Sequence, residues 1–125
     1  MKWTFTKEDL SLYQQKYGAD HAVAGYAEKA QLTKLTLPKY YVVVIDDQKL
    51  SLVHLSMKLE EKEVTQIPLA EIRHVKVSGM LVKKVVMETS DATYKLRVNP
   101  LGFGLGDVQK ALVKRLEELE SNNTV

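Results

Sequence analysis

The stretch YYVVVIDDQKLSLVHL, residues 40–55, decides the fold of this chain. It begins with a tyrosine pair and the β-branched run 42–45, which is too short for a buried helix and is typical of a β-strand. Asp46 and Asp47 end the run, because aspartate side chains bond nearby backbone groups in tight turns. An apolar pattern then resumes. The stretch predicts a β-hairpin whose first strand is covered on both faces.

The returning strand is predicted over residues 49–57, and its apolar residues change parity midway. Leu50 and Leu52 occupy even positions, whereas the apolar residues from Val53 onward occupy odd positions. Successive side chains of a strand point to opposite faces, so the change predicts a β-bulge or a barrel corner here.

Further short apolar alternations follow, separated by turn residues such as Gly79. In the last of them Tyr94 is predicted to point inward, with Lys95 and Arg97 pointing outward. Leu81 is placed in a strand, on the face that carries the other apolar residues. The predicted strands are 64–69, 72–78, 81–89 and 92–98.

Residues 21–33 (HAVAGYAEKAQLT) are compatible with two structures. Their alanine content favours a helix, whereas Gly25 and the apolar residues on alternate positions favour a strand. We predict a strand, which brings the total to about seven consecutive strands. Such a series implies antiparallel neighbours that curl into a barrel or into two packed sheets.

Amphipathic helices are predicted on either side of the strands. Thr6 can cap a helix over residues 7–17, Asp9 completes a capping box, and Gly18 would end the helix in the left-handed conformation. A second helix near the other end can plug the barrel, and residues 122–125 are expected to fray. Its predicted apolar stripe consists of Val108, Ala111, Leu112, Leu116 and Leu119.

Composition and charge exclude several classes of protein. The chain has 125 residues, which suits one domain. It has no cysteine, which excludes disulfides, thiol catalysis and thiolate metal sites. The net charge of +2 is too small to indicate a nucleic-acid-binding protein. Without a long apolar run or a secretory leader pattern, we expect a cytoplasmic protein that can lie peripherally at a membrane.

Three segments resemble bacterial pleckstrin-homology-like (PH-like) domains. Residues 40–53 (YYVVVIDDQKLSLV) are similar to the second and third strands of that family. Residues 65–81 (TQIPLAEIRHVKVSGML) are similar to the fourth and fifth strands, and 92–98 (ATYKLRV) to the seventh. The resemblance implies a mainly β fold with added α structure, in which about seven antiparallel strands form a PH-like barrel capped by a C-terminal helix.

The same resemblance divides the chain into three parts. Residues 1–19 are predicted to be an N-terminal helical extension, 20–121 the PH-like domain and 122–125 a frayed tail. It implies a binding or scaffolding module rather than an enzyme, and no cofactor. The implied partner is another protein, a second copy of the chain or an anionic membrane surface, with nucleic acid disfavoured.

Basic residues offer the candidate binding sites. PH domains that bind phosphoinositides carry a basic motif on the first two strands and their loop, but here that loop holds only Lys34 and Lys39, so the motif is not matched. These two lysines are candidate loop contacts. Four basic residues on neighbouring strands form a candidate interaction patch. The alternative interpretation is that they belong to an ordinary solvated strand face. The patch consists of Arg73, Lys76, Lys83 and Lys84.

Other motifs predict no chemistry. The glycine-rich segment 102–106 precedes a helix but lacks the lysine of a phosphate-binding loop, and Asp107 at the expected N-cap would repel an anion. His21, His54 and His74 are too scattered for a metal site. No acid–base constellation can be assembled. Two alternatives stay open: a small-ligand or lipid-binding β-barrel, and a weak nucleic-acid-binding β-domain.

Overall fold

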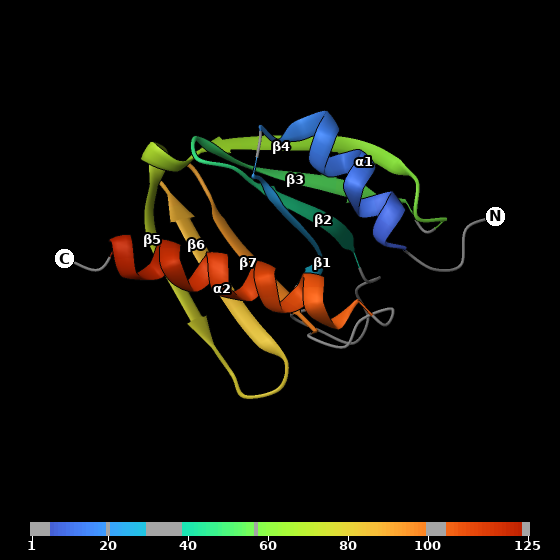
Figure 1. The fold of residues 1–125 in the computed structure, drawn as a ribbon. Coiled ribbons are helices and arrows are strands. Elements are labelled where there is room, and N and C mark those ends of the chain that lie inside the picture. Colours follow the sequence, from blue (N-terminus) through green and yellow to red (C-terminus); the bar gives the residue numbers. More distant parts are fainter. Residues whose placement is uncertain (1–5, 20, 30–38, 57, 100–104, 124–125) are drawn as a thin grey trace.

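The computed structural model describes residues 6–19, 21–29, 39–56, 58–99 and 105–123. These residues form one seven-stranded antiparallel sheet and two α-helices, so the predicted fold class is confirmed (Figure 1). The elements in chain order are α1 (Lys7–Tyr17), β1 (Val23–Lys29), β2 (Tyr40–Ile45), β3 (Lys49–Leu55), β4 (Glu61–Pro68), the 3₁₀ turn η1 (Leu69–Glu71), β5 (Ile72–Ser78), β6 (Lys83–Thr89), β7 (Thr93–Val98) and α2 (Gly106–Asn123).

The sheet has two parts that meet at a narrow seam. The strand order is β4-β3-β2-β1-β7-β6-β5, and β1 pairs with β7 only through Glu28 opposite Arg97 and Lys29 opposite Leu96. We call β1–β4 the first half-sheet and β5–β7 the second half-sheet. Helix α2 lies against both halves, where it contacts β1 and β5 (Figure 1).

Within the first half-sheet, strands β1, β2 and β3 are buried on both faces, which explains the continuous apolar run of β2, whereas most residues of β4 are exposed. Val43 and Ile45 belong to the inner cluster, together with the apolar stripe of α2. Val42 and Val44 belong to a separate outer cluster, which is covered by α1 (Figure 1). The prediction that this strand is covered on both faces is therefore confirmed.

The predicted cause of the parity change in β3 was wrong. The β2–β3 register runs without a break from Ile45 opposite Leu50 to Tyr40 opposite Leu55. Both parities of β3 are apolar because α1 covers the outer face, and no bulge toward β2 is needed. A register shift does occur between His54 and Leu55, but it lies in the pairing with β4.

Helix α2 packs over the seam between the two half-sheets and bonds to the backbone on both sides of it. The buried Gln109 side chain accepts a hydrogen bond from the Tyr26 N–H at 2.7 Å and donates to the Tyr26 carbonyl at 2.8 Å. It also donates to the carbonyl of Asn99 at 2.9 Å. Gly25 permits this approach, because a Cβ there would lie 2.6 Å from Leu112 Cδ2. The strand prediction for this segment is confirmed, and its glycine serves close packing.

The helices follow the prediction with local differences. The capping box of Thr6 and Asp9 is present at the start of α1. Gly18 is extended rather than left-handed, and it is needed because a Cβ would lie 2.4 Å from the Ala22 Cβ. In α2, Ala111 is exposed, and Asp107 lies in the first turn rather than at the cap. Met57 and the glycine-rich segment before Leu105 lie outside the described residues.

The strand predictions were correct in order but not in every boundary. Strand β4 starts at Glu61, three residues earlier than expected, because its first residues are charged and lack the apolar alternation. Strand β6 starts at Lys83 rather than at Leu81. Leu81 was predicted to pack with the core, but it lies in the β5–β6 turn and is 81% exposed. The division into an extension, a domain and a tail stays a prediction.

Candidate functional site

The outer face of the second half-sheet carries a group of exposed cationic side chains. Strand alternation places Val75 and Val85 on the inner face and leaves the polar residues between them on the outer face. The cations on this face are Lys76 on β5, Lys84 on β6, and Lys95 and Arg97 on β7. We call these four residues the basic face.

Register brings the members of the basic face together. Lys84 lies directly opposite Arg97, and Lys76 and Lys95 flank Val86 in the next row across the sheet. Among the residues that the structure describes, none of these four cations forms an ion pair. Lys84 and Arg97 are like charges directly opposite each other, and Glu28 of β1 lies opposite Arg97 on its other side, so this row holds one acidic residue beside its two cations.

The structure unites only part of the predicted patch. Lys76 and Lys84 lie in neighbouring rows, whereas Arg73 sits at a register shift near the other end of β5. Lys83 alternates with Lys84 and donates a hydrogen bond to the Gly79 carbonyl at 2.9 Å. Of the two candidate loop lysines, Lys39 is exposed just before β2, and Lys34 lies outside the described residues.

Sequence reasoning missed Lys95 and Arg97 as members of this surface. Both were predicted to point outward from the alternation in β7, but the partner strand was not considered. Antiparallel pairing of consecutive strands would have placed Arg97 beside Lys84. The available signal was therefore the short turn between β6 and β7, which makes them neighbours.

The β5–β6 turn exposes apolar side chains next to the basic face. Met80 is 92% exposed, Leu81 81% and Val82 39%. Gly79 has a φ of +101°, and a Cβ there would lie 2.4 Å from the Val82 carbonyl oxygen. The turn therefore requires glycine at this position. Figure 1 shows the β5–β6 hairpin extending beyond the rest of the sheet.

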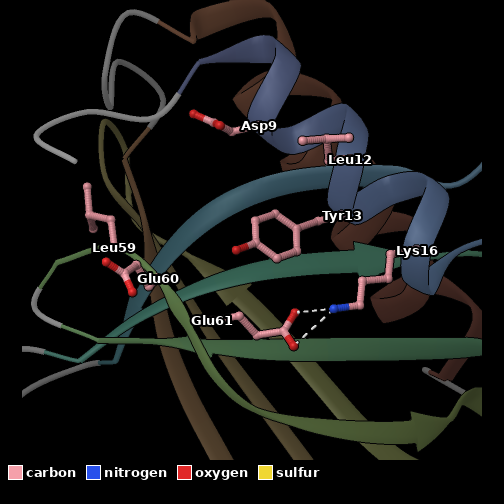
Figure 2. Close-up of a pocket in the computed structure, with 7 residues that line it drawn as sticks. All are labelled: Asp9, Leu12, Tyr13, Lys16, Leu59, Glu60 and Glu61. Carbon is pink, nitrogen blue, oxygen red and sulfur yellow. Dashed lines mark hydrogen bonds and ion pairs between the residues drawn. The ribbon is translucent and has the colours of Figure 1, made fainter. Parts of the chain in front are cut away.

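A separate groove of about 410 Å³ lies between α1 and the β3–β4 turn (Figure 2). Leu59, which has a φ of +62°, is buried at this groove. The turn is held by the Ser56 hydroxyl, which accepts hydrogen bonds from the N–H groups of Lys58 and Glu60. The lining residues are Asp9, Leu12, Tyr13, Lys16, Leu59, Glu60 and Glu61.

Polar groups at this groove bond to one another. The Glu61 carboxylate accepts hydrogen bonds from the Tyr17 hydroxyl at 2.7 Å and from Lys16 Nζ at 3.1 Å (Figure 2 shows the Lys16 pair). These two contacts, that with Tyr17 first, hold the pKa of Glu61 below its usual range. Burial, with the nearby Glu61 charge, raises the pKa of Tyr13. The arrangement attaches α1 to the sheet.

Residues 15–102 match the family model of the bacterial PH domain. The chain belongs to the bacterial PH domain family. The match begins inside α1, so most of this helix lies outside the family model. A comparison with curated proteins gives no match.

Two solved structures of similar fold come from human proteins. The N-terminal PH domain of ARAP2 has a TM-score of 0.51 at 18% identity, covering 86% of this chain and 87% of that one. The hSac2 domain of the phosphoinositide phosphatase Sac2 has a TM-score of 0.55 at 5% identity, covering 98% of this chain and 88% of that one. At these identities the likeness concerns the fold alone.

The described histidines of this PH domain form no metal site, and its buried aromatic residues contact other side chains of the fold. The three histidines lie apart, and no group of three or more potential metal ligands occurs within the described ranges. His54 lies 3.3 Å from a Glu63 oxygen, and its ring centroid is 5.3 Å from that of Tyr41. Tyr26 is buried and stacks on Tyr40. No described helix combines the length and apolar character needed to cross a bilayer.

Proposed function

We propose that this bacterial PH domain is a non-enzymatic binding module that attaches to anionic membrane surfaces through its basic face. The observation that carries the proposal is the placement of Lys76, Lys84, Lys95 and Arg97 on adjoining strands, exposed and without ion pairs among the described residues.

The alternatives have less support. A ligand-carrying barrel needs interior space, but the inner cluster fills the barrel with fully buried side chains such as Met87, Leu112 and Leu116. A nucleic-acid-binding domain usually carries a larger positive charge than +2. Addition of a strand at the β4 edge is opposed by charges at Glu61, Lys62 and Glu63 and by Pro68 at its end.

The basic face by itself gives only weak attachment. Each lysine or arginine near an anionic bilayer contributes roughly 1 kcal/mol, so four contribute on the order of 4 kcal/mol. That free energy corresponds to a dissociation constant of about 1 mM. We therefore expect binding that is detectable at low salt, fades at physiological salt and needs a further contact to be stable.

Co-sedimentation with vesicles tests the proposal. The domain is mixed with phosphatidylcholine vesicles with or without phosphatidylserine, at low and physiological salt. We expect binding only to the anionic vesicles, and a loss of at least about thirty-fold in the Lys84→Glu/Arg97→Glu variant, since removing two cations costs about 2 kcal/mol.

The matched control is Lys7→Glu/Lys62→Glu, which has the same net charge but alters exposed residues of α1 and β4. Equal losses in the two variants would show that total charge, and not the basic face, governs binding. Absence of wild-type binding to anionic vesicles at low salt would refute the proposal. Binding to a polyanion such as heparin or DNA but not to vesicles would assign the face to a different partner.

A further inference from the structure

The apolar tip of the β5–β6 hairpin is a built feature rather than a loose turn. Met80, Leu81 and Val82 form the tip, and all three are exposed. Gly79 adopts the left-handed conformation that the turn needs, and Lys83 Nζ donates to the Gly79 carbonyl across its base. The β5–β6 hairpin projects at one end of the sheet (Figure 1), and its turn exposes these apolar residues to solvent.

Charge is distributed unevenly along the hairpin. The row nearest the tip contains Lys84 and Arg97, with Glu28 of β1 opposite Arg97, and the next row contains Lys76 and Lys95. In the third row Glu88 lies between His74 and Thr93, and the exposed Arg73 stands beside His74 at the register shift of β5. The two rows behind the apolar tip therefore hold more basic than acidic residues, whereas the third row has Arg73 against Glu88.

This spatial order, an apolar tip followed by cationic rows, matches the layers of an anionic bilayer. At about 3.3 Å per strand residue, Lys84 lies roughly 7 Å behind Val82, and Lys76 and Lys95 lie in the row beyond it. Interfacial segments bury their apolar side chains about 5–10 Å into the boundary between headgroups and acyl chains. The row of Lys84 and Arg97 would then lie near the level of the lipid phosphates, with the row of Lys76 and Lys95 about 7 Å further from the bilayer centre.

We propose that Met80 and Leu81, with Val82 at their side, insert into the membrane interface as an apolar anchor while the basic face contacts anionic headgroups. This inference rests on the proposed function and identifies the second contact that the basic face requires. The occupant is the lipid surface itself, because a protruding apolar tip backed by cations complements a layer that is apolar inside and anionic at its surface.

The first test compares vesicle binding of Met80→Ser/Leu81→Ser with that of Leu12→Ser. Leu12 is also an exposed apolar residue, 66% exposed, but it lies on α1. We expect at least tenfold weaker binding to phosphatidylserine-containing vesicles for the tip variant and unchanged binding for Leu12→Ser. Both changes affect exposed side chains, so unfolding temperatures should equal that of the wild type, and this equality is the folding control.

The second test measures the depth of the tip directly. Leu81→Trp and Leu12→Trp are each made in a Trp3→Phe background, so that a single tryptophan reports. On anionic vesicles we expect the emission of the Leu81→Trp protein to shift to shorter wavelength and to be quenched by brominated acyl chains. The Leu12→Trp protein should show neither effect.

The outcomes separate this inference from the proposed function. Salt-sensitive vesicle binding with no shift or quenching at Leu81→Trp, and with full binding by the serine variant, would leave the proposed function intact and overturn insertion. Quenching at Leu12→Trp instead would overturn it and point to α1. No vesicle binding would overturn both. A concentration-dependent dimer that the serine variant abolishes would assign the tip to a protein contact, against the inference.

Discussion

The two halves of the sheet share one fold but differ in what covers them. The first half-sheet lies between α1 and α2, so that four consecutive residues of β1, four of β2 and four of β3 are buried. The second half-sheet is covered by α2 on its inner face only, and its strands alternate between buried and exposed residues. Continuous burial marks strands β1–β3, which hold the fold together, and exposed residues on the outer face mark the half that is free to bind.

The largest expected effect distinguishes the outer faces of the two halves. Val44 is 1% exposed on the outer face of β2, whereas Val86 is half-buried on the outer face of β6. We expect Val44→Asp to lower the free energy of unfolding by about 4 kcal/mol or more, because it buries an unpaired charge. Val86→Asp should cost about 1 kcal/mol or less. Urea unfolding measures both, and equal losses would contradict the comparison.

A second prediction concerns the helix that makes the first half two-sided. Leu10 is 2% exposed in the outer cluster, and Leu12 is 66% exposed two residues later. Leu10→Ala should lower the free energy of unfolding by about 3 kcal/mol through lost apolar contact and a cavity. The Leu12→Ala control should stay within about 0.5 kcal/mol of the wild type. Thermal or urea unfolding measures the stability of both variants. Equal stabilities would show that α1 is only loosely attached to the sheet.

A third prediction addresses the seam between the halves. Replacement of Gln109 by the similarly shaped methionine leaves the backbone groups of Tyr26 without their side-chain partner. We expect a loss of about 2 kcal/mol in urea unfolding, since a buried unsatisfied polar group is costly. Gln15→Met, at an exposed position of α1, is the control and should be neutral. Wild-type stability in Gln109→Met would mean that strand pairing alone joins the halves.

The smallest expected effect is a dependence on pH at the β2–β3 turn. Burial alone would raise the pKa of Asp46, but the N–H groups of Gln48, Lys49 and Ala19 outweigh it and hold that pKa below its usual range. A carboxyl with a lowered folded-state pKa stabilises the fold above its unfolded pKa, and this contribution is lost as the pH falls through the folded value.

Substitution by asparagine tests this account. Asp46→Asn should cost about 1 kcal/mol at neutral pH and flatten the decline of stability below about pH 4. Urea midpoints measured from neutral to acid pH give both quantities. Asp47→Asn alters the exposed neighbour in the same turn and should keep the acid slope of the wild type. An unchanged slope in Asp46→Asn would place the acid sensitivity elsewhere in the chain.

Much of the fold was predictable because its signals are local. The β-branched run of β2, the aspartates after it and the capping box of α1 act over a few residues. The errors arose where distant segments meet. The parity of β3 was misinterpreted because α1, far away in the sequence, covers its outer face. Leu81 was assigned to a strand because apolar character alone does not distinguish a buried residue from an exposed turn.

The candidate site was predictable only in part for the same reason. Lys76 and Lys84 were recognised as neighbours on adjacent strands, whereas Arg73 was included although a register shift and the length of β5 separate it from them. Arg97 was left out although it lies opposite Lys84. The charge of a residue does not show where that residue lies in space. Which charged residues share one surface depends on the register of the strands.

By itself, the sequence determined the order and type of the elements, the hairpin at residues 40–55 and the resemblance to PH-like domains, because periodicity and turn chemistry are local properties. Tertiary structure alone decided which faces are covered and why Gln109 is buried. It also decided that Met80 and Leu81 stand exposed beside the basic face. These features depend on contacts between residues far apart in the chain, which only packing and register specify.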